Sequence, residues 1–231
     1  MIDIHSHVLP GIDDGSGSVE ESVAMLRESA RYGIRCVAAT PHFYPAENSP
    51  EQFLERREAA ADRLRAAWEP GLPELLLGAE VQFFEGISRA EEIDALALGG
   101  RLLLLEMPFC PWTDRMISEA VLLREQRGLE VVLAHIEQYL RWQPRELWNE
   151  LPGLRLLTQC NAGFFLDWRT RRRARRMLAE GKIHLVGSDA HNMTSRPPRL
   201  GKALASLGEG ERQVLERNAR WLLPIEGGAV P

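Results

Sequence analysis

Side chains that can bind metal recur at the ends of short apolar segments of the chain. They are His5, His7, His42, Glu80, Glu106, His135, Asp189 and His191. His5 and His7 are two residues apart, as are Asp189 and His191, so in an extended strand both members of each pair point to the same face. A lone histidine at a strand end is usually a cap or a surface residue, but recurrence at six segments predicts one shared site.

The residue types indicate which ions such a site would hold. Imidazole combined with carboxylate favours Mn²⁺, Zn²⁺ or Fe over Ca²⁺. Asp14, in the turn after the first segment, adds a ninth ligand, with Asp13 as the alternative. Nine ligands exceed one tetrahedral site, so we expect two or three divalent ions. Their charge would attract an anionic substrate such as a phosphate, and would make bound water a nucleophile.

Parallel α/β folds place such chemistry at the carboxyl ends of their strands. Short continuous apolar runs predict seven parallel strands that are buried on both faces. The predicted strands are Ile2–Val8, Arg35–Thr40, Leu75–Val81, Arg101–Glu106, Glu130–His135, Arg155–Cys160 and His184–Ser188. His184 begins a strand instead of ending one, so we interpret it as structural.

Helical patterns separate the strands and carry start and stop signals. Helices are predicted to open at the caps Ser18, Ser49, Thr113 and Thr170 and at Pro144, with capping boxes completed by Glu21 and Gln52. The alternation predicts an α/β fold. No linker or repeat interrupts it, so we expect a single domain over residues 1–231 that ends in a C-terminal tail after Trp221.

Composition and charge exclude several classes of protein. Lys and Arg number 28 and Asp and Glu 33, so the formal net charge is −5 and no general nucleic-acid binding is expected. Three cysteines, far apart in the chain, argue against a disulfide scaffold and favour a cytoplasmic location. No apolar run approaches the roughly 20 residues that span a bilayer, and no signal-peptide pattern opens the chain, so no membrane insertion is expected.

The motifs around the metal-binding residues resemble those of the polymerase and histidinol phosphatase (PHP) superfamily. They are His5-Ser-His7, Thr-Pro-His42, Gly-Ala-Glu80, Glu106-Met-Pro, Ala-His135 and Ser-Asp189-Ala-His191. Longer stretches, such as Ile2 to Gly15, Asn161 to Gly163 and Ser188 to Arg196, are similar to the branch of manganese-dependent protein-tyrosine phosphatases of bacterial capsule and exopolysaccharide synthesis. The resemblance implies a distorted seven-stranded (β/α)7 TIM-like barrel with a trinuclear metal centre.

The resemblance also implies how the ligands divide among the ions. One ion would be held by His5, His7, Glu80 and Asp189, a second by Glu80, Glu106 and His135, and a third by Asp14, His42 and His191. Either Glu80 or Glu106 would bridge two ions. Manganese is the expected metal, with iron and zinc as alternatives.

One departure from the branch concerns phosphate binding. The branch usually has Glu-Arg-Tyr after the histidine of the fifth strand, whereas this chain has Gln138 in place of the arginine. An amide has neither the charge nor the bidentate fork of a guanidinium, so we expect substrate binding by Gln138 to be supplemented by Arg141. Arg196 matches another phosphate-facing arginine of the branch. Arg196, Asp189 and His42 are the residues we expect to be catalytic.

The implied activity is hydrolysis of a phosphate monoester by metal-bound hydroxide, with phosphotyrosine in the C-terminal tail of a bacterial tyrosine kinase as substrate. No cysteine lies in a Cys-x5-Arg loop, which excludes the cysteine-based mechanism. The nearer alternative is a phosphoesterase that acts on histidinol phosphate, a nucleotide or another small molecule. The remoter one is a nucleic-acid-binding or partner-binding module with a degenerate metal site. Homo-oligomers occur in the family and are a further expectation.

An arginine-rich run, Arg169 to Arg176, supports that remoter alternative. Such a run is most often a solvated helix face, and Ala174, Met177 and Leu178 give the helix a buried side. Its functional interpretation is electrostatic capture of an acidic phosphorylated tail.

Three aromatic groups are candidates for the walls of a tyrosyl-binding cleft, although packing is the commoner role of such residues. They are Phe43 with Tyr44, Phe109 with Trp112, and Phe164 and Phe165 with Trp168.

Overall fold

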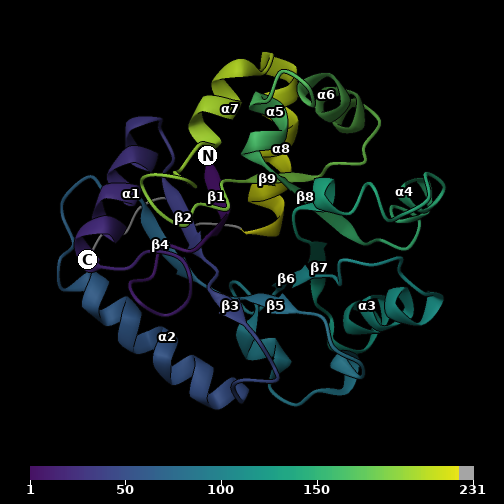
Figure 1. Ribbon diagram of the computed structural model, residues 1–231, viewed down its shortest axis with the longest axis horizontal. Coiled ribbons are helices and arrows are strands. Elements are labelled where there is room, and N and C mark those ends of the chain that lie inside the picture. The colour runs from purple at the N-terminus through teal and green to yellow at the C-terminus, as the bar shows by residue number, and fades with distance from the viewer. Residues whose placement is uncertain (224–231) are drawn as a thin grey trace.

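The computed structural model describes residues 1–223, and its strands curl together at the centre of a surrounding layer of helices (Figure 1). The strands are β1 (Ile2–Ser6), β2 (Cys36–Ala39), β3 (His42–Phe43), β4 (Glu74–Leu77), β5 (Glu80–Gln82), β6 (Leu102–Glu106), β7 (Glu130–Leu133), β8 (Leu157–Asn161) and β9 (Leu185–Gly187). From residue 224 onward, the predicted C-terminal tail lies outside the described residues.

Helices connect successive strands and cover the outside of the sheet. The α-helices are α1 (Val19–Arg31), α2 (Pro50–Arg65), α3 (Asp114–Arg127), α4 (Leu147–Glu150), α5 (Ala162–Leu166), α6 (Arg171–Ala179), α7 (Leu200–Ser206) and α8 (Glu209–Leu222). Short 3-10 helices occupy Ile87–Arg89, Ile93–Leu96 and Ile136–Gln138. Within residues 1–223, no helix has the length and apolar character needed to cross a membrane.

The strands pair in parallel in two groups, β1-β2-β4 and β3-β5-β6-β7-β8-β9. The chain itself joins the two groups, because β2 leads into β3 and β4 leads into β5 with two residues between each pair. The backbone pairing also continues along this junction, where Gly78 N donates to Ala39 O at 3.0 Å and Glu80 N donates to Pro41 O at 3.1 Å. At the opposite edge, Asp189 N donates to His5 O at 2.8 Å, and Ser6 forms a parallel bridge with Ala190. The sheet therefore curls until β1 lies beside the segment that follows β9, and the predicted α/β class with a parallel sheet is confirmed.

The ends of the predicted strands shift by one or two residues in the structure, and two of the strands differ further. The predicted strand Leu75–Val81 is interrupted at Gly78 and divides into β4 and β5. A Cβ atom on Gly78 would lie 2.5 Å from Leu98 Cγ, so the chain passes tightly over that side chain. The predicted strand Arg35–Thr40 is followed by the additional strand β3. Pro41 separates the two because it has no N–H to donate to a ladder.

Strand β1 contains a bulge that determines which side chains face inward. Asp3 pairs with Val37 and Ser6 pairs with Ala39, so β1 has one residue more than β2 over this interval. A bulge of this kind shifts the alternation of side chains. As a result, Ile4 joins the apolar interior of the curled sheet while His5, the next residue, also reaches the interior side.

The interior is apolar at the amino ends of the strands. Its buried cluster includes Ile2, Ile4, Cys36, Ala38, Leu102, Leu104, Val132, Ala134 and Leu185 from the strands and Ala219 and Leu222 from α8. The larger core lies outside the sheet, where the helices pack. For example, the ring of Phe53 in α2 packs edge to face on that of Phe43 in β3, with ring centroids 5.3 Å apart. The polar residues of the interior are thereby restricted to the carboxyl ends.

Capping explains most of the helix boundaries. Ser49 and Gln52 form the predicted capping box of α2, with Pro50 at its first position. Ser18 caps α1, but the predicted box is incomplete because Glu21 accepts a hydrogen bond from Gly17 N instead.

Two further helix predictions need correction. Thr170 does not cap α6 with its side chain, because its hydroxyl donates to Phe164 O at 2.8 Å. The predicted start at Pro144 is wrong: α4 begins at Leu147.

Candidate metal centre

The predicted metal ligands converge at the carboxyl ends of the strands. Their ligand atoms form three groups, each with all atoms within 4.8 Å of one another. The groups are His7, Asp14, His42 and His191; His5, His7 and Glu80; and Glu80, Glu106 and His135. Asp189 lies beside them, with Oδ1 at 3.5 Å from both His5 Nε2 and His7 Nε2. His184 lies elsewhere, with Nδ1 2.8 Å from Thr158 Oγ1.

Glu80 is the carboxylate at the centre of these groups. Its Oε2 lies 3.2 Å from His5 Nε2, 3.3 Å from His7 Nε2 and 3.0 Å from His42 Nδ1. Its Oε1 lies 2.7 Å from His135 Nε2. Burial would raise the pKa of Glu80, but the surrounding imidazoles outweigh burial and hold it well below the usual range. Glu80 is therefore a buried carboxylate that stays ionised.

Glu106 is placed less centrally. Its Oε1 lies 3.6 Å from His135 Nε2, the one imidazole of the described residues that forms an ion-pair contact with it. Burial, followed by the charge of Glu80, raises the pKa of Glu106. Of the two glutamates, the geometry favours Glu80 as the ligand shared between groups.

Asp13 and Asp14 occupy different positions despite being neighbours. Asp13 Oδ2 lies 2.7 Å from His7 Nδ1, and the backbone N–H groups of Gly15 and His42 donate to its carboxylate at 3.0 Å. Burial opposes ionisation of Asp13, but these contacts lower its pKa to about 2. Asp14 has a side chain that is 66% exposed, with Oδ1 at 3.5 Å from His42 Nε2. The geometry thus favours Asp14 as a ligand and Asp13 as the residue that orients His7.

Three histidines have one ring nitrogen fixed by an oxygen acceptor. His7 Nδ1 contacts Asp13, His5 Nδ1 lies 3.3 Å from Gln159 Oε1, and His191 Nδ1 lies 3.1 Å from the backbone oxygen of Asp189. An acceptor at Nδ1 keeps the proton there, so in a neutral imidazole Nε2 presents a lone pair. In all three residues that lone pair faces the carboxylate cluster.

Unpartnered buried atoms show that these residues fit divalent metal ions. Within residues 1–223, His191 Nε2, His42 Nδ1 and Glu80 Oε2 are buried and form no hydrogen bond of suitable geometry, although the last two atoms lie only 3.0 Å apart. His5 Nε2 and His7 Nε2 lie 3.2 Å apart with their lone pairs directed to the same space. Buried polar atoms in proteins are normally satisfied, and a cation would satisfy all of these at once.

A pair of amide side chains connects the candidate ligands by hydrogen bonds. The sequence alone did not reveal this connecting role. Gln159 Oε1 accepts from His135 N at 2.7 Å, and Gln159 Nε2 donates to Asn161 Oδ1 at 2.9 Å. Asn161 Nδ2 donates in turn to Asp189 Oδ2 at 2.6 Å. The available signal was their spacing, since Gln159 and Asn161 are two residues apart at the end of β8, like His5 and His7 in β1.

Two of the candidate ligands have a backbone conformation that non-glycine residues rarely adopt. His135 has φ +31° and Asp189 has φ +50°, both in the left-handed region. Such conformations cost about 1–3 kcal/mol each and persist where the surroundings fix them. Here both residues are hydrogen-bonded to side chains of β8: His135 N donates to Gln159 Oε1, and Asn161 Nδ2 donates to Asp189 Oδ2. The strain aims two side chains that directly follow strands into the same cluster.

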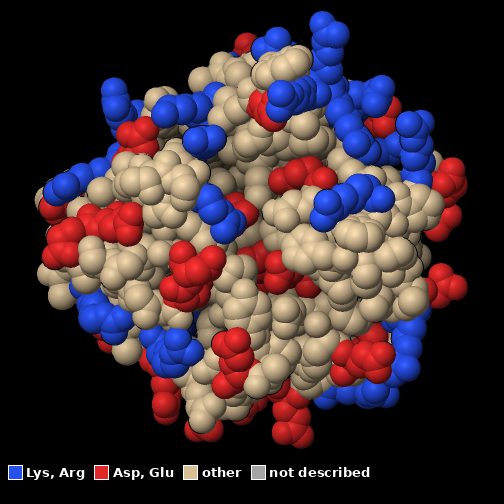
Figure 2. All heavy atoms as spheres, in the orientation of Figure 1, with Lys and Arg blue, Asp and Glu red and all other residues tan. Residues whose placement is uncertain are grey.

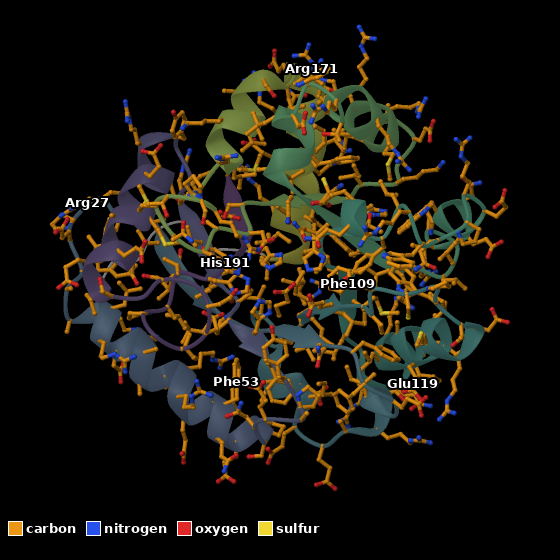
Figure 3. The ribbon with its side chains drawn as sticks, viewed as in Figure 1. Arg27, Phe53, Phe109, Glu119, Arg171 and His191 are labelled. Atoms are coloured by element: carbon orange, nitrogen blue, oxygen red, sulfur yellow. The ribbon has the colours of Figure 1, made fainter. Side chains whose placement is uncertain are left out.

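A cavity of about 410 Å³ opens onto the cluster. Its lining comprises His42, Tyr44, Glu80, Glu106, His135, Gln138, Asn161, Asp189 and Arg196. Figure 2 shows the corresponding hollow, in which carboxylates are visible near the centre of this face, and Figure 3 labels His191 and Phe109 on either side of the centre of the molecule. Arg196 Nη2 donates to Asp189 Oδ2 at 2.8 Å, and its side chain is 44% exposed. Gln138 and Arg196 are therefore positioned to contact whatever enters.

Arg141 is not brought to this cavity. Its guanidinium carbon lies 4.9 Å from the centroid of the Trp142 ring, and it is not among the residues that line the cavity. The polypeptide turns after the 3-10 helix Ile136–Gln138, so Gln138 faces the cavity while the arginine three residues later projects onto Trp142. The structure does not support the expectation that Arg141 supplements Gln138.

Only some of the predicted aromatic residues lie at the site. The ring of Tyr44 stacks on His42 with centroids 5.1 Å apart, and that of Phe109 stacks on His135 at 6.1 Å. The remaining members lie in the core or away from the cavity: Phe43, Phe164 and Phe165 are buried, Trp112 packs edge to face on Tyr139, and Trp168 is exposed beside Arg169. The cleft prediction is therefore reduced to Tyr44 and Phe109.

The fold and the site together define an α/β protein with a candidate metal centre at the carboxyl ends of its curled parallel sheet. The family model "Capsular polysaccharide synthesis, CpsB/CapC" matches residues 1–222, so the chain belongs to the CpsB/CapC family. This confirms the resemblance to the capsule branch that the motifs indicated.

Individual members of the family are similar over most of their length. The tyrosine-protein phosphatase CpsB of Streptococcus pneumoniae is 34% identical in an alignment of 224 positions that covers 88% of each protein. The tyrosine-protein phosphatase YwqE of Bacillus subtilis (strain 168) is 29% identical in an alignment of 236 positions that covers 96% of this chain and 91% of YwqE.

A solved structure supports the same relationship. It comes from crystal structures of YwqE from Bacillus subtilis and CpsB from Streptococcus pneumoniae, which are described as unique metal-dependent tyrosine phosphatases. The alignment has a TM-score of 0.82 at 27% sequence identity and covers 97% of this chain and 94% of the solved chain.

Proposed function

We propose that this chain is a metal-dependent protein-tyrosine phosphatase that dephosphorylates a bacterial tyrosine kinase of capsule or exopolysaccharide synthesis. The observation that carries the proposal is the convergence of imidazole and carboxylate side chains at the floor of one open cavity, which five of them line, together with buried nitrogen and oxygen atoms that lack a hydrogen bond within the described residues. The relatives CpsB and YwqE, which are named as tyrosine-protein phosphatases, support the substrate class.

The proposal includes two or three divalent ions, with manganese as the expected metal. The nine proposed ligands are His5, His7, Asp14, His42, Glu80, Glu106, His135, Asp189 and His191. When bound, such ions supply Lewis-acid charge to a phosphoryl group and activate water. Glu80 is our candidate for the shared ligand, because its two oxygens face imidazoles of different groups.

Residues of the chain itself would bind and orient the phosphate. Arg196 lines the cavity, and its guanidinium can donate to phosphate oxygens in the bidentate manner that carboxylates and phosphates favour. Asp189 fixes one edge of that guanidinium, so the group is oriented before substrate arrives. Gln138 adds an uncharged amide donor from the same wall.

Phosphotyrosine suits a site that offers little general acid. A phenolate leaving group has a pKa of about 10, so it departs with less proton assistance than an alkoxide needs. Cysteine nucleophiles are disfavoured, because burial raises the pKa of Cys36 to about 12 and that of Cys160 well above the usual range. Cys110 does not line the cavity.

The proposal extends to architecture and context. Hydrogen bonding between β1 and the segment after β9 supports a distorted seven-stranded (β/α)7 barrel, in which β2 with β3 and β4 with β5 each count as one interrupted strand. The continuous curl supports a single domain. Three free cysteines support a cytoplasmic enzyme. The resemblance further implies a homo-oligomer, which analytical ultracentrifugation would test.

Hydrolysis of a phosphotyrosine peptide, measured with added Mn²⁺ and after chelation, tests the proposal. We expect turnover with Mn²⁺, loss of turnover after chelation, and recovery when Mn²⁺ is restored. Full activity of the chelated, metal-free protein would contradict the metal-dependent mechanism. A parallel panel of histidinol phosphate and nucleotides separates the alternatives, because a preference for either over the phosphopeptide would assign the site to small molecules.

A further inference from the structure

Helix α6 carries a concentration of positive charge that the proposed metal centre does not use. Its sequence from residue 171 is Arg-Arg-Arg-Ala-Arg-Arg-Met-Leu-Ala, and Arg169 precedes it. All six arginines, Arg169, Arg171, Arg172, Arg173, Arg175 and Arg176, are exposed, and we refer to them as the basic face. Figure 2 shows the cluster of blue side chains over this helix, and Figure 3 labels Arg171 there.

The basic face is poorly neutralised by the rest of the protein. Within residues 1–223, Arg175 is its one member with a carboxylate partner within 4.0 Å, namely Glu211 at 3.8 Å. The first turn of α6 contains no acidic residue and three arginines. Positive charge at a helix amino end is electrostatically unfavourable, so this arrangement opposes helix stability. Partial burial lowers the pKa of Arg173, and the charges of Arg145 and Arg176 lower it further because like charges repel.

A second cavity adjoins the basic face. It has a volume of about 360 Å³ and is lined by Phe165, Leu166, Arg171, Arg172, Arg175 and Ser206. Arginines therefore surround an opening with two apolar side chains from α5 in its wall. This combination of guanidinium groups with a small apolar surface fits a polypeptide that bears carboxylates.

The second cavity lies close to the metal centre along the chain. Asn161 lines the metal-site cavity, and the five-residue helix α5 leads directly from it to Phe165 and Leu166. At about 1.5 Å per residue this helix is roughly 8 Å long. An extended peptide advances about 3.3 Å per residue, so about three residues span that interval.

We propose that the basic face and its adjoining cavity bind an acidic polypeptide segment that flanks the phosphorylated tyrosine of the substrate. This inference rests on the proposed phosphatase function and names the second part of the substrate that the enzyme recognises. The basic face holds the acidic flank while the phosphorylated residue occupies the metal-site cavity. The flank raises the local concentration of the phosphorylated residue at the site.

The structure favours a polypeptide over a membrane or a nucleic acid. A helix that binds a membrane surface presents its apolar side to lipid, whereas Ala174, Met177 and Leu178 of α6 are buried in the protein. A long polyanion such as DNA would also meet the net negative charge of the chain, −5, beyond this one helix. A short acidic segment contacts the basic face alone.

The test compares two phosphotyrosine peptides that differ only in their flanks. One carries glutamates from three to eight positions on either side of the phosphotyrosine, and the other carries glutamines there. For the variant R171Q/R172Q we expect an increase in KM of about tenfold with the glutamate peptide at low salt. Its kcat, its KM for the glutamine peptide and its turnover of p-nitrophenyl phosphate should match the wild type, and added salt should remove the difference from wild type.

A matched control has the same change of charge at a distance. R27Q/R31Q removes two exposed arginines from α1. Figure 3 labels Arg27 at the left edge of the molecule, away from Arg171 at the top. We expect this variant to behave as wild type with both peptides. Equal losses in the two variants, or equal losses with the two peptides, would overturn the inference.

Binding of the unphosphorylated glutamate peptide, followed by fluorescence anisotropy, separates this inference from the proposed function. The inference is supported if the wild type binds the glutamate peptide more tightly than the glutamine peptide and R171Q/R172Q does not. This holds even if the wild type hydrolyses no phosphotyrosine. Equal binding of both peptides overturns it. Phosphatidylglycerol vesicles and duplex DNA complete the test. If R171Q/R172Q loses more affinity for vesicles or for DNA than for the glutamate peptide, the basic face belongs to that partner and the inference is overturned.

Discussion

At the scale of single residues, the position of Glu80 distinguishes the two glutamates at the site. Glu80 faces imidazoles with both of its oxygens, whereas Glu106 approaches His135 alone. We expect Glu80→Gln, which keeps the volume and removes the charge, to lose most bound Mn²⁺ and to lower kcat/KM by more than about a hundredfold.

The matched variant Glu106→Gln should lose a smaller share of the metal. Mass-spectrometric metal counts on both variants, dialysed against the same Mn²⁺ concentration, make the comparison. Glu106→Gln losing more metal than Glu80→Gln would reverse our assignment of the shared ligand.

The convergence of the candidate ligands was predictable from the sequence, and the residues that orient them were not. His5 and His7 follow the two-residue period of a strand, and histidine is itself evidence of a metal site. Gln159 has no such signature, because an amide is not a typical metal ligand and its role depends on His5, 154 positions away. Arg141 illustrates the converse, since proximity in sequence to Gln138 did not place its side chain at the cavity.

Gln138 provides a second test at this scale. It lines the cavity where the branch usually has arginine. We expect Gln138→Arg to lower KM for a phosphotyrosine peptide by about tenfold, because a guanidinium adds charge and a second hydrogen bond to phosphate. Gln138→Lys, which adds charge without the planar fork, should give a smaller gain. Unchanged steady-state kinetics in both variants would indicate that position 138 does not contact the phosphate.

At the scale of elements, close packing between β1 and β9 holds His5 in place. A Cβ atom on Gly187 would lie 2.6 Å from His5 Cβ and 3.0 Å from Gln159 Nε2. We expect Gly187→Ala to push β1 and β9 apart, to lower the free energy of unfolding by about 1–3 kcal/mol and to weaken Mn²⁺ binding. Urea denaturation and Mn²⁺ titration measure the two effects separately.

Gly163 offers the control for this substitution. It lies in α5, and an added Cβ there would meet no atom within 4 Å. Gly163→Ala should leave Mn²⁺ binding unchanged and stabilise the protein by up to about 1 kcal/mol, because alanine is the better helix former. Weaker Mn²⁺ binding in Gly163→Ala, or unchanged binding in Gly187→Ala, would contradict the packing argument.

The elements themselves were predictable to different degrees. Apolar runs locate the strands well because both faces of the sheet are buried. The interruption at Gly78 was not predictable, since it depends on the distant side chain of Leu98. The bulge in β1 was hidden for a similar reason, because a bulge is defined by the register with β2 and not by the residues of β1 alone.

At the scale of the whole molecule, the net charge of −5 conceals an uneven distribution. Carboxylates gather inside the metal-site cavity and arginines gather on α6, so the two regions have opposite sign (Figure 2). Bound divalent ions would reverse the sign of the cavity. The loaded protein would then present an anion-binding cavity beside an anion-binding helix, which suits a substrate that is acidic over several residues.

The same ions should contribute to global stability. Without them, the part of the protein that the structure describes buries imidazole nitrogens and one carboxylate oxygen, Oε2 of Glu80, that lack a hydrogen bond. A ligand that binds only the folded state at about a thousandfold above its Kd stabilises that state by about 4 kcal/mol. For a chain of this size, 1 kcal/mol raises Tm by about 2–4 °C, so we expect saturating Mn²⁺ to raise Tm by roughly 8–16 °C over the chelated protein.

Calorimetric scans of the chelated and Mn²⁺-saturated protein would measure this shift. Ca²⁺ should give a much smaller one, because imidazole is a poor ligand for that ion. His42→Ala should reduce the Mn²⁺ shift in proportion to the sites it removes, while its chelated form should unfold near the temperature of the chelated wild type. An equal shift with Ca²⁺ would mean that the ions act through exposed carboxylates such as Asp14 and not through the buried imidazoles.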